Sequence, residues 1–397
     1  MNRQIGSILL QNADIYVEND ILQNGYLLLT DGKIADIGKM ENLKQQSFEH
    51  VHVISLEPGT AIVPGFIDVH IHGAGGADTM DGTPSALQTI AGSLPKEGTT
   101  SFLATTMTQS EESIIKALRN AADYQSIAHD RAEAEVIGIH LEGPFINPSK
   151  KGAQPEEYIL EPDIDLFNRW QQEAKGTIRL VTVAPEMPNG NEFIRHLAAH
   201  NVTASIGHTD STFAQVRDAV TAGATHVTHL YNGMRGLHHR EPGTAGAALL
   251  FDELNVELIS DGIHICPEMI QLAVKAKGPE RLLLITDAMR AKCLKSGQYE
   301  LGGQPVIVAD GRATLEDGTL AGSILKMIDS VKNMLAFTSL ELQDIVKLAS
   351  VNPAKQAHVY DRKGSITIGK DADIVVLDSD MNIELTICRG QIAYQKG

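Results

Sequence analysis

Two histidines separated by one residue stand at the end of an apolar run near position 70. His70 and His72 follow Val69 and Ile71, in a segment that is otherwise mostly apolar. Successive side chains of a strand point to opposite faces, so the two imidazoles share one face. Neutral imidazole is a good ligand for borderline metals, and the pair could bind one ion. Taken alone, the pair could equally be two hydrogen-bonded histidines at a strand end.

The ends of later apolar runs carry further side chains of the kinds that bind metals. These are Glu142, His208, His229, Asp261 and Asp287. If the strand ends meet, histidines and carboxylates converge, and clustered buried carboxylates need a compensating cation. A divalent metal meets that need, and six ligands suffice for two ions that share a carboxylate. The sequence therefore predicts a metal site that includes the first two histidines.

The elements that position these residues are eight apolar, β-branched runs that alternate with amphipathic stretches of helical length. The runs lie at residues 61–72, 99–104, 136–141, 178–184, 202–206, 226–230, 256–259 and 282–286. Such alternation predicts a parallel sheet covered by helices, and eight strands predict a TIM-like (β/α)8 barrel. An open doubly wound sheet is the alternative, but no Gly-rich dinucleotide fingerprint follows the first strand.

Both ends of the chain are rich in short predicted strands, unlike the middle. Strands separated by turn signals such as Asn24-Gly25 fill residues 7–56, and strands return at 365–369 and from there to 394. The simplest packing is one small β-sandwich domain, built from residues 1–60 and 360–397. It would flank a barrel domain that spans residues 61–359.

Composition narrows the class of protein. The net charge of −17 over 397 residues argues against a nucleic-acid or anionic-membrane partner, which would need a basic surface. No run approaches the ~20 apolar residues that span a bilayer, and the N-terminus has no signal-type apolar core. Three cysteines without a CxxC pair fit a reducing compartment. We therefore expect a soluble, cytoplasmic protein.

A series of motifs along the chain carries a family resemblance. They are PGFIDVHIHG (64–73), HLEGPFINPSKKGA (140–153), GHTDS (207–211), THLYNGM (228–234), REPG (240–243), SDGIHI (260–265), TDAM (286–289) and LAGS (320–323). The chain resembles the amidohydrolase superfamily of metal-dependent hydrolases and, within it, the N-acetylglucosamine-6-phosphate deacetylases. The first motif marks only the superfamily, whereas HLEGPF, HLYNGM and SDGIHI together are far more specific.

The resemblance implies a binuclear metal centre. Glu142 would bridge two ions, with His208 and His229 completing one site. The other site would consist of His70, His72, Glu142 and Asp287. Imidazole and carboxylate suit Zn or Fe, with Mn or Co as alternatives.

The implied reaction is hydrolysis of N-acetyl-D-glucosamine 6-phosphate to D-glucosamine 6-phosphate and acetate, in amino-sugar catabolism and cell-wall sugar recycling. A metal-activated hydroxide would attack the acetamide carbon. Asp287 would accept the water proton and deliver it to the departing amine. His264 would hydrogen-bond the substrate, and Asp261 would support the loop that carries His264.

The resemblance also implies a phosphate site. Backbone N–H groups of Asn232 and Gly233 and the side chain of Arg240 would bind the phosphate. In the family this arginine comes from the neighbouring subunit, which implies a homodimer. The positions matching the wall of the sugar pocket are Ala153, Leu320, Ala321 and Gly322.

Two alternatives concern the substrate and a third concerns activity itself. Gln154 stands where some family members have a histidine, and glutamine cannot become cationic. N-acetylgalactosamine 6-phosphate is therefore an alternative substrate. Another amidohydrolase reaction, of the cyclic amidase or deaminase type, would not need Arg240. A catalytically inactive scaffold is disfavoured because every expected ligand is present.

Overall fold

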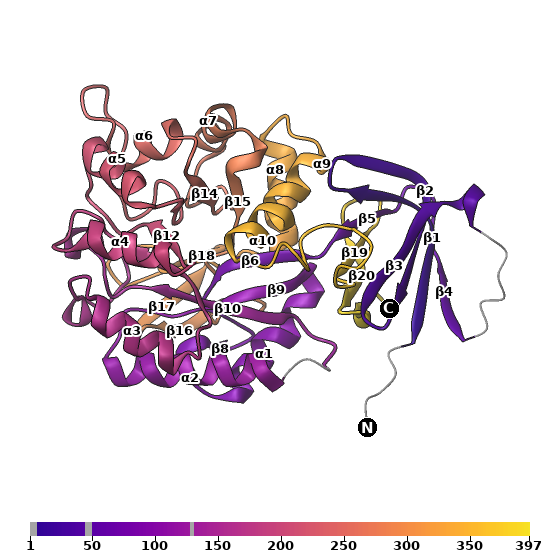
Figure 1. The fold of residues 1–397 in the computed structure, drawn as a ribbon, viewed down its shortest axis with the longest axis horizontal. Helices are drawn as coiled ribbons and strands as arrows, with labels where there is room; N and C mark the ends of the chain where they lie inside the picture. The colour runs from indigo at the N-terminus through magenta and orange to yellow at the C-terminus, as the bar shows by residue number, and fades with distance from the viewer. Residues whose placement is uncertain (1–5, 44–49, 128–130) are drawn as a thin grey trace.

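The computed structural model describes residues 6–43, 50–127 and 131–397. Two β-structures dominate it: a parallel barrel ringed by helices, and a separate sheet to its right in Figure 1. Strands from both ends of the chain form that second sheet, which we call the terminal sheet. The predicted fold class, a barrel flanked by β-structure from both termini, is confirmed.

Eight parallel strands form the barrel. In order around it they are β6 (Phe66–Ile71), β9 (Thr99–Thr105), β10 (Glu135–Glu142), β11 (Ile178–Val183), β12 (Thr203–Ile206), β13 (His226–Val227), β14 (Asn255–Leu258) and β15 (Leu282–Leu284). The residues of all eight are buried, apart from one partly buried position in β11. Burial on both faces explains why these runs are apolar rather than alternating.

The first and last barrel strands meet just beyond the carboxyl end of β15. The Asp287 N–H donates to the His70 carbonyl at 2.8 Å, and the His72 N–H donates to the Ala288 carbonyl at 2.9 Å. Deeper in the barrel, the buried carboxylate of Asp68 accepts a hydrogen bond of 2.5 Å from the Thr286 hydroxyl. These bonds close the barrel where the candidate ligands of its first and last strands lie.

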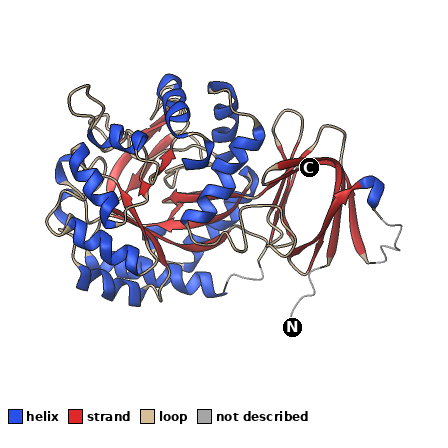
Figure 2. Cartoon of the chain, turned by 45° about the horizontal axis from the view of Figure 1, so that its top comes forward, coloured by secondary structure: helices blue, strands red, loops and turns tan. Residues whose placement is uncertain are grey.

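Helices cover the outside of the barrel (Figure 2). They are α1 (Pro84–Ser93), α2 (Glu111–Ile127), α3 (Ile164–Glu173), α4 (Gly190–Ala199), α5 (Phe213–Ala222), α6 (Gly243–Leu250), α7 (Pro267–Lys277), α8 (Met327–Phe337), α9 (Leu342–Val346) and α10 (Asn352–Gln356). Helix α3 shows how local sequence sets a helix and its buried face. Asp163 caps its first turn, and Phe167 and Trp170 face the core. No helix in the described part of the chain is long and apolar enough to cross a membrane.

The terminal sheet joins the two ends of the chain. Its strands, in spatial order, are β21 (Gln391–Gln395), β20 (Ile383–Cys388), β19 (Ile374–Leu377), β5 (Ala61–Pro64), β1 (Ser7–Val17), β2 (Asp20–Thr30) and β3 (Lys33–Lys39), with β4 (Val51–Ser55) paired to β1. The antiparallel pair β5–β19 connects the two ends. Residues 1–5 and 44–49 of the predicted domain lie outside the described residues, and its division from the barrel domain stays a prediction.

Two predicted strands differ from the structure. The run at 61–72 is split at Gly65 into β5 of the terminal sheet and β6 of the barrel. The Gly65 N–H bonds the Asp373 carbonyl, and a Cβ at Gly65 would lie 2.2 Å from the Thr100 hydroxyl, so the chain crosses here without a side chain. The strand predicted at 365–369 is absent, because Gly369 closes a turn and donates to the Ile34 carbonyl instead.

A smaller sheet lies at the mouth of the barrel. It consists of β16 (Gly297–Leu301), β17 (Gln304–Ala309) and β18 (Arg312–Thr314). A short hairpin of β7 (Gly73–Ala74) and β8 (Ala77–Asp78) follows the first barrel strand. Leu301, at the end of β16, lines the cavity at the carboxyl ends of the barrel strands.

Candidate active site

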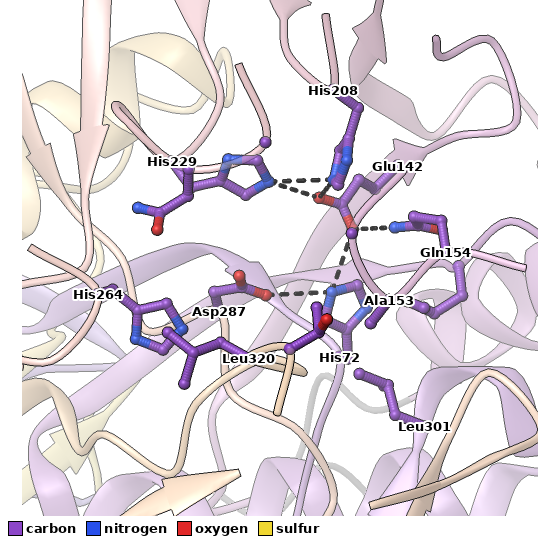
Figure 3. A pocket seen from close by; sticks show the side chains of 16 residues that line it. His72, Glu142, Ala153, Gln154, His208, His229, His264, Asp287, Leu301 and Leu320 are labelled. Atoms are coloured by element: carbon purple, nitrogen blue, oxygen red, sulfur yellow. Dashed lines mark hydrogen bonds and ion pairs between the residues drawn. The ribbon is translucent and has the colours of Figure 1, made fainter. Parts of the chain in front are cut away.

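The six predicted metal ligands converge at the carboxyl ends of the barrel strands. We call them the ligand cluster. Figure 3 labels His72, Glu142, His208, His229 and Asp287 of this set. They form two groups, and within each group the ligand atoms lie within 4.8 Å of one another: His70, His72 and Asp287 in one, Glu142, His208 and His229 in the other. The strands that carry them are parallel, so their carboxyl ends share one edge of the barrel.

The carboxylate of Glu142 joins the two groups. Its Oε1 lies 3.3 Å from Nε2 of both His208 and His229, and 3.2 Å from Nε2 of His70. Its Oε2 lies 3.2 Å from Nε2 of His72. Each oxygen of one side chain therefore faces different histidines, which is the arrangement that a bridging ligand requires.

Three members of the ligand cluster have left-handed backbone conformations. The φ angles are 47° at His208, 28° at His229 and 46° at Asp287. Non-glycine residues adopt such angles rarely, and they collect at functional sites where the surrounding structure imposes them. At these positions the chain turns sharply out of the strand, and the side chain is left pointing inward over the barrel.

Hydrogen bonds at Nδ1 orient two of the histidines. Nδ1 of His70 lies 2.9 Å from the Glu257 carboxylate, and Nδ1 of His208 lies 2.8 Å from the Lys150 carbonyl. Because these partners accept hydrogen bonds, each Nδ1 carries the proton and donates, and each Nε2 keeps a lone pair for a metal. Glu257 also accepts a bond of 2.9 Å from the His229 backbone N–H.

The electrostatics of the cluster fit a divalent cation. Burial lowers the pKa of His72, but Asp287 and Glu142 outweigh burial and raise it to about 10. Burial raises the pKa of Glu142, yet the surrounding histidines hold it well below its usual range. Without a metal, protonated imidazoles therefore balance the carboxylates. Nε2 of His70 is buried and faces the Glu142 carboxylate at 3.2 Å, and this donor set of nitrogen and oxygen suits a divalent metal.

A cavity of ≈ 240 Å³ opens above the ligand cluster. His264 forms part of its wall, and Nδ1 of His264 lies 2.6 Å from the Asp261 carboxylate. The other oxygen of Asp261 accepts the backbone N–H groups of Ile263 and His264, both at 2.8 Å. Asp261 thus contacts the His264 loop and is not a member of either ligand group.

Most of the predicted substrate residues line this cavity: Ala153, Asn232, Gly233, His264, Leu320 and Gly322. Ala321 does not, because it is fully buried behind its neighbours and its N–H bonds the Ala313 carbonyl. Arg240 is exposed on a loop, beside His239 and away from the cavity wall. The backbone N–H of Asn232 donates to the His229 carbonyl, so it is not available for an anion as predicted.

Sequence reasoning missed Glu257 and the contacts of Gln154. Glu257 is a buried carboxylate between Val256 and Leu258 in strand β14. That interruption was the available signal, because a buried charge needs partners. Gln154 does line the cavity, but its amide also donates to Glu142 at 2.9 Å, a contact that no local pattern indicates.

Comparisons with known proteins agree with this geometry. The Amidohydrolase family model matches residues 61–393. The chain is 50% identical to an N-acetylglucosamine-6-phosphate deacetylase of Bacillus subtilis (strain 168), over 98% of this chain and 97% of that protein. It is 36% identical to an N-acetylgalactosamine-6-phosphate deacetylase of Escherichia coli O157:H7, over 97% of this chain and 99% of the relative.

A solved structure is similar over nearly the whole length. It is a mutant of the N-acetyl-D-glucosamine-6-phosphate deacetylase from Mycobacterium smegmatis in complex with N-acetyl-D-glucosamine-6-phosphate. The TM-score is 0.90 at 30% identity, covering 98% of this chain and 100% of the other. The chain therefore belongs to the amidohydrolase family and, within it, to the group that includes the N-acetylglucosamine-6-phosphate deacetylases.

Proposed function

We propose that this protein hydrolyses the acetamide of N-acetyl-D-glucosamine 6-phosphate to D-glucosamine 6-phosphate and acetate. The observation that carries the proposal is the pair of ligand groups joined through Glu142 at the floor of the cavity. The deacetylases that are similar over nearly the whole chain support the choice of substrate. The three free cysteines are consistent with a reaction in the reducing cytoplasm.

The amidohydrolase family implies a divalent metal, and we propose two ions per subunit, Zn or Fe, with Mn or Co as alternatives. His208, His229 and Glu142 would hold one ion. His70, His72, Glu142 and Asp287 would hold the other. When bound, such ions lower the pKa of a coordinated water and polarise the acetamide carbonyl.

Asp287 is the residue proposed to move the proton. Burial raises the pKa of its carboxyl group, but His70 and His72 outweigh burial and keep the pKa below the usual value. The carboxylate is therefore ionised near neutral pH and can accept the proton of the attacking water. It then delivers that proton to the amine nitrogen, which leaves poorly unless protonated.

His264 is proposed to hold the sugar. Its Nδ1–H donates to Asp261, so in the neutral ring Nε2 is an acceptor. This geometry suits a sugar hydroxyl, which donates. Asp261 fixes both the tautomer and the ring orientation through its three bonds to residues 263 and 264.

The phosphate is proposed to bind at the loop of Asn232 and Gly233, through the Gly233 backbone N–H, with a cation from a second copy of the chain. Among the described residues that line the cavity there is no lysine or arginine, although the substrate is an anion. Arg240 is exposed on the loop after β13, where a homodimer partner could present it. This reading predicts a homodimer in which each site is incomplete alone.

Acetate release tests the substrate. Metal-replete protein would be assayed with N-acetylglucosamine 6-phosphate, N-acetylgalactosamine 6-phosphate and unphosphorylated N-acetylglucosamine. We expect rapid turnover of the first and slow turnover of the third, because the third lacks the anionic handle. Faster turnover of the galactosamine compound would replace the proposed substrate, and no release from any would overturn the deacetylase function.

Mixed subunits test the contribution of Arg240. The variants Arg240→Ala and Asp287→Asn should each be inactive or strongly impaired as homodimers. If Arg240 acts across the interface, a heterodimer has one site with both residues intact, and mixing restores part of the activity. If it acts within its own subunit, every site in the mixture lacks one residue and mixing restores nothing.

A further inference from the structure

Gln154 is placed between the ligand cluster and the loop that follows β9. Its side chain is 4% exposed and comes from the loop that follows Glu142. Oε1 accepts a hydrogen bond of 2.7 Å from the Thr108 backbone N–H, and Nε2 donates to Oε2 of Glu142 at 2.9 Å. Figure 3 shows the Gln154 amide pointing at the Glu142 carboxylate rather than into the open cavity.

The partner on the backbone decides which way the amide faces. The Thr108 N–H can only donate, so the amide oxygen of Gln154 must lie on its side. The NH₂ group then faces Glu142, whose ionised carboxylate can only accept. Both contacts are satisfied in one orientation of the amide and neither in the flipped one.

A bridging carboxylate needs such a restraint. Oε1 of Glu142 faces His208 and His229 and also lies near His70, while Oε2 faces His72. If the carboxylate rotated about its terminal C–C bond, Oε2 would move away from His72. The metal position beside His72 would then lose its Glu142 ligand. The Gln154 N–H bond to Oε2 opposes that rotation, because turning the carboxylate breaks the bond.

We propose that Gln154 is a positioning residue, whose amide holds Glu142 as the bridge between two metal positions. The proposal rests on the two-ion site of the proposed function. Because the amide is neutral, it orients the carboxylate without competing for its charge. A glutamate of the same length could still accept from Thr108, but it would present a second anion to Glu142 and offer no donor.

Metal binding tests the proposal without relying on activity. Metal-free protein would be titrated with Co²⁺ alone, and the ions per chain and their affinities followed by visible absorption. The variants are Gln154→Met, which keeps the volume but removes both hydrogen bonds, and Gln154→Glu, which reverses the contact with Glu142. The matched control is Gln109→Met, since the Gln109 amide bonds the Gly302 carbonyl and touches no ligand.

We expect two ions per chain for the parent and for Gln109→Met. Both Gln154 variants should bind at least one ion about 10- to 100-fold more weakly, the usual effect of losing a group that orients a ligand. Parent-like binding of both ions by both Gln154 variants would overturn the proposal, and so would a parent that binds one ion only. Acetate release by the parent is measured in parallel, so that failure of the proposed reaction is seen separately from failure of the bridge.

Discussion

The protein buries a cluster of charged side chains at each end of its barrel strands, and the two clusters are built from different residue types. The ligand cluster at the carboxyl ends contains histidines and carboxylates. At the amino ends, where the barrel meets the terminal sheet, Glu135, Asp371 and Asp373 surround Lys363, with Arg362 alongside. We call these five residues the junction cluster.

The junction cluster supplies its own cations. Lys363 is 1% exposed, and its Nζ lies 2.8 Å from Glu135, 3.3 Å from Asp371 and in direct contact with Asp373. Arg362 lies 2.7 Å from both Glu135 and Asp371. Burial raises the pKa of Glu135, but Lys363 and Arg362 outweigh burial and hold it well below the usual value.

The difference separates a structural site from a chemical one. The cations of the junction cluster are side chains of the protein itself, so its carboxylates are always paired. These ion pairs connect the barrel to the terminal sheet. The ligand cluster contains no lysine or arginine among its six members, so its anions are balanced by protons or by an exchangeable metal. A buried charge cluster without fixed cations therefore indicates a binding site for a cation.

The largest difference between the two clusters is expected in catalysis, at Asp287. Asp287→Asn should lower kcat for acetate release by about 10²- to 10⁴-fold, because general acid–base catalysis is worth that much. Lys363→Met should leave kcat per folded molecule unchanged, since it lies at the other end of the barrel. Steady-state kinetics on metal-loaded protein measure both, and a kcat for Asp287→Asn within tenfold of the parent would contradict the assignment.

The junction should dominate stability. Lys363→Met leaves three buried carboxylates short of a cation and should lower the free energy of unfolding by about 3–5 kcal/mol. The control Lys396→Met removes an exposed pair with Glu384 and should leave the unfolding midpoint in place. Urea unfolding gives both values. Equal unfolding midpoints for the two variants would show that the junction cluster does not stabilise the folded protein.

Metal removal should act on the ligand cluster alone. An ion that binds only the folded chain stabilises it by about 2.7 kcal/mol at 100 times its Kd. A chelator should therefore lower the unfolding midpoint, by the same amount in the parent and in Lys363→Met, because the clusters share no residues. The prediction fails if a chelator leaves the midpoint of the parent unchanged.

Glu257 lies behind the ligand cluster, where it contacts two of the ligand residues. Glu257→Gln weakens the support of His70 Nδ1 and the His229 backbone and should reduce metal affinity about 10- to 100-fold. Glu173→Gln, which alters an exposed carboxylate paired with Arg119, serves as the control. Calorimetric titration with Zn²⁺ measures both, and parent-like affinity for Glu257→Gln would rule out the supporting role.

The smallest effect is expected from pH. The pKa of Glu135 is lowered, so its stabilisation is present above its unfolded value and is lost only in acid. The pKa of Lys363 is raised, so its stabilisation is present below its unfolded value and is lost only in strong alkali. Between about pH 6 and pH 8 the junction contribution is thus constant. The metal-dependent increment should shrink towards pH 6, because protons compete for the ligands.

Unfolding midpoints with and without Zn²⁺ across that range would check this. A metal increment that does not change with pH would contradict the competition. The midpoint of the metal-free protein should itself fall as pH rises through this range, because the raised pKa of His72 gives a stabilisation that is complete below its unfolded value and is lost above it.

Much of the candidate site could be predicted from the pattern of apolar and polar residues along the chain. Apolar runs without polar alternation predicted parallel strands, and parallel strands bring their carboxyl ends to one edge. That geometry is general, so His70, Glu142 and Asp287 could be placed together although they are far apart in sequence. The strand predicted at 365–369 is absent because its last residues form a turn whose backbone bonds Ile34, which no local pattern distinguishes from a strand.

The sequence by itself predicted the barrel, the β-rich termini and the candidate ligands at the strand ends, because repeating periodicity and residue type are local properties. The assignment of six of these candidates to two sites came from the family resemblance. Only the tertiary structure decided that Gly65 divides a single apolar run between two sheets. It alone placed Gln154 and Glu257 against the ligands, and Arg362 against Glu135 across 227 positions of chain. Such contacts depend on how distant backbones approach one another, and the residues that make them leave no periodic signal in the sequence.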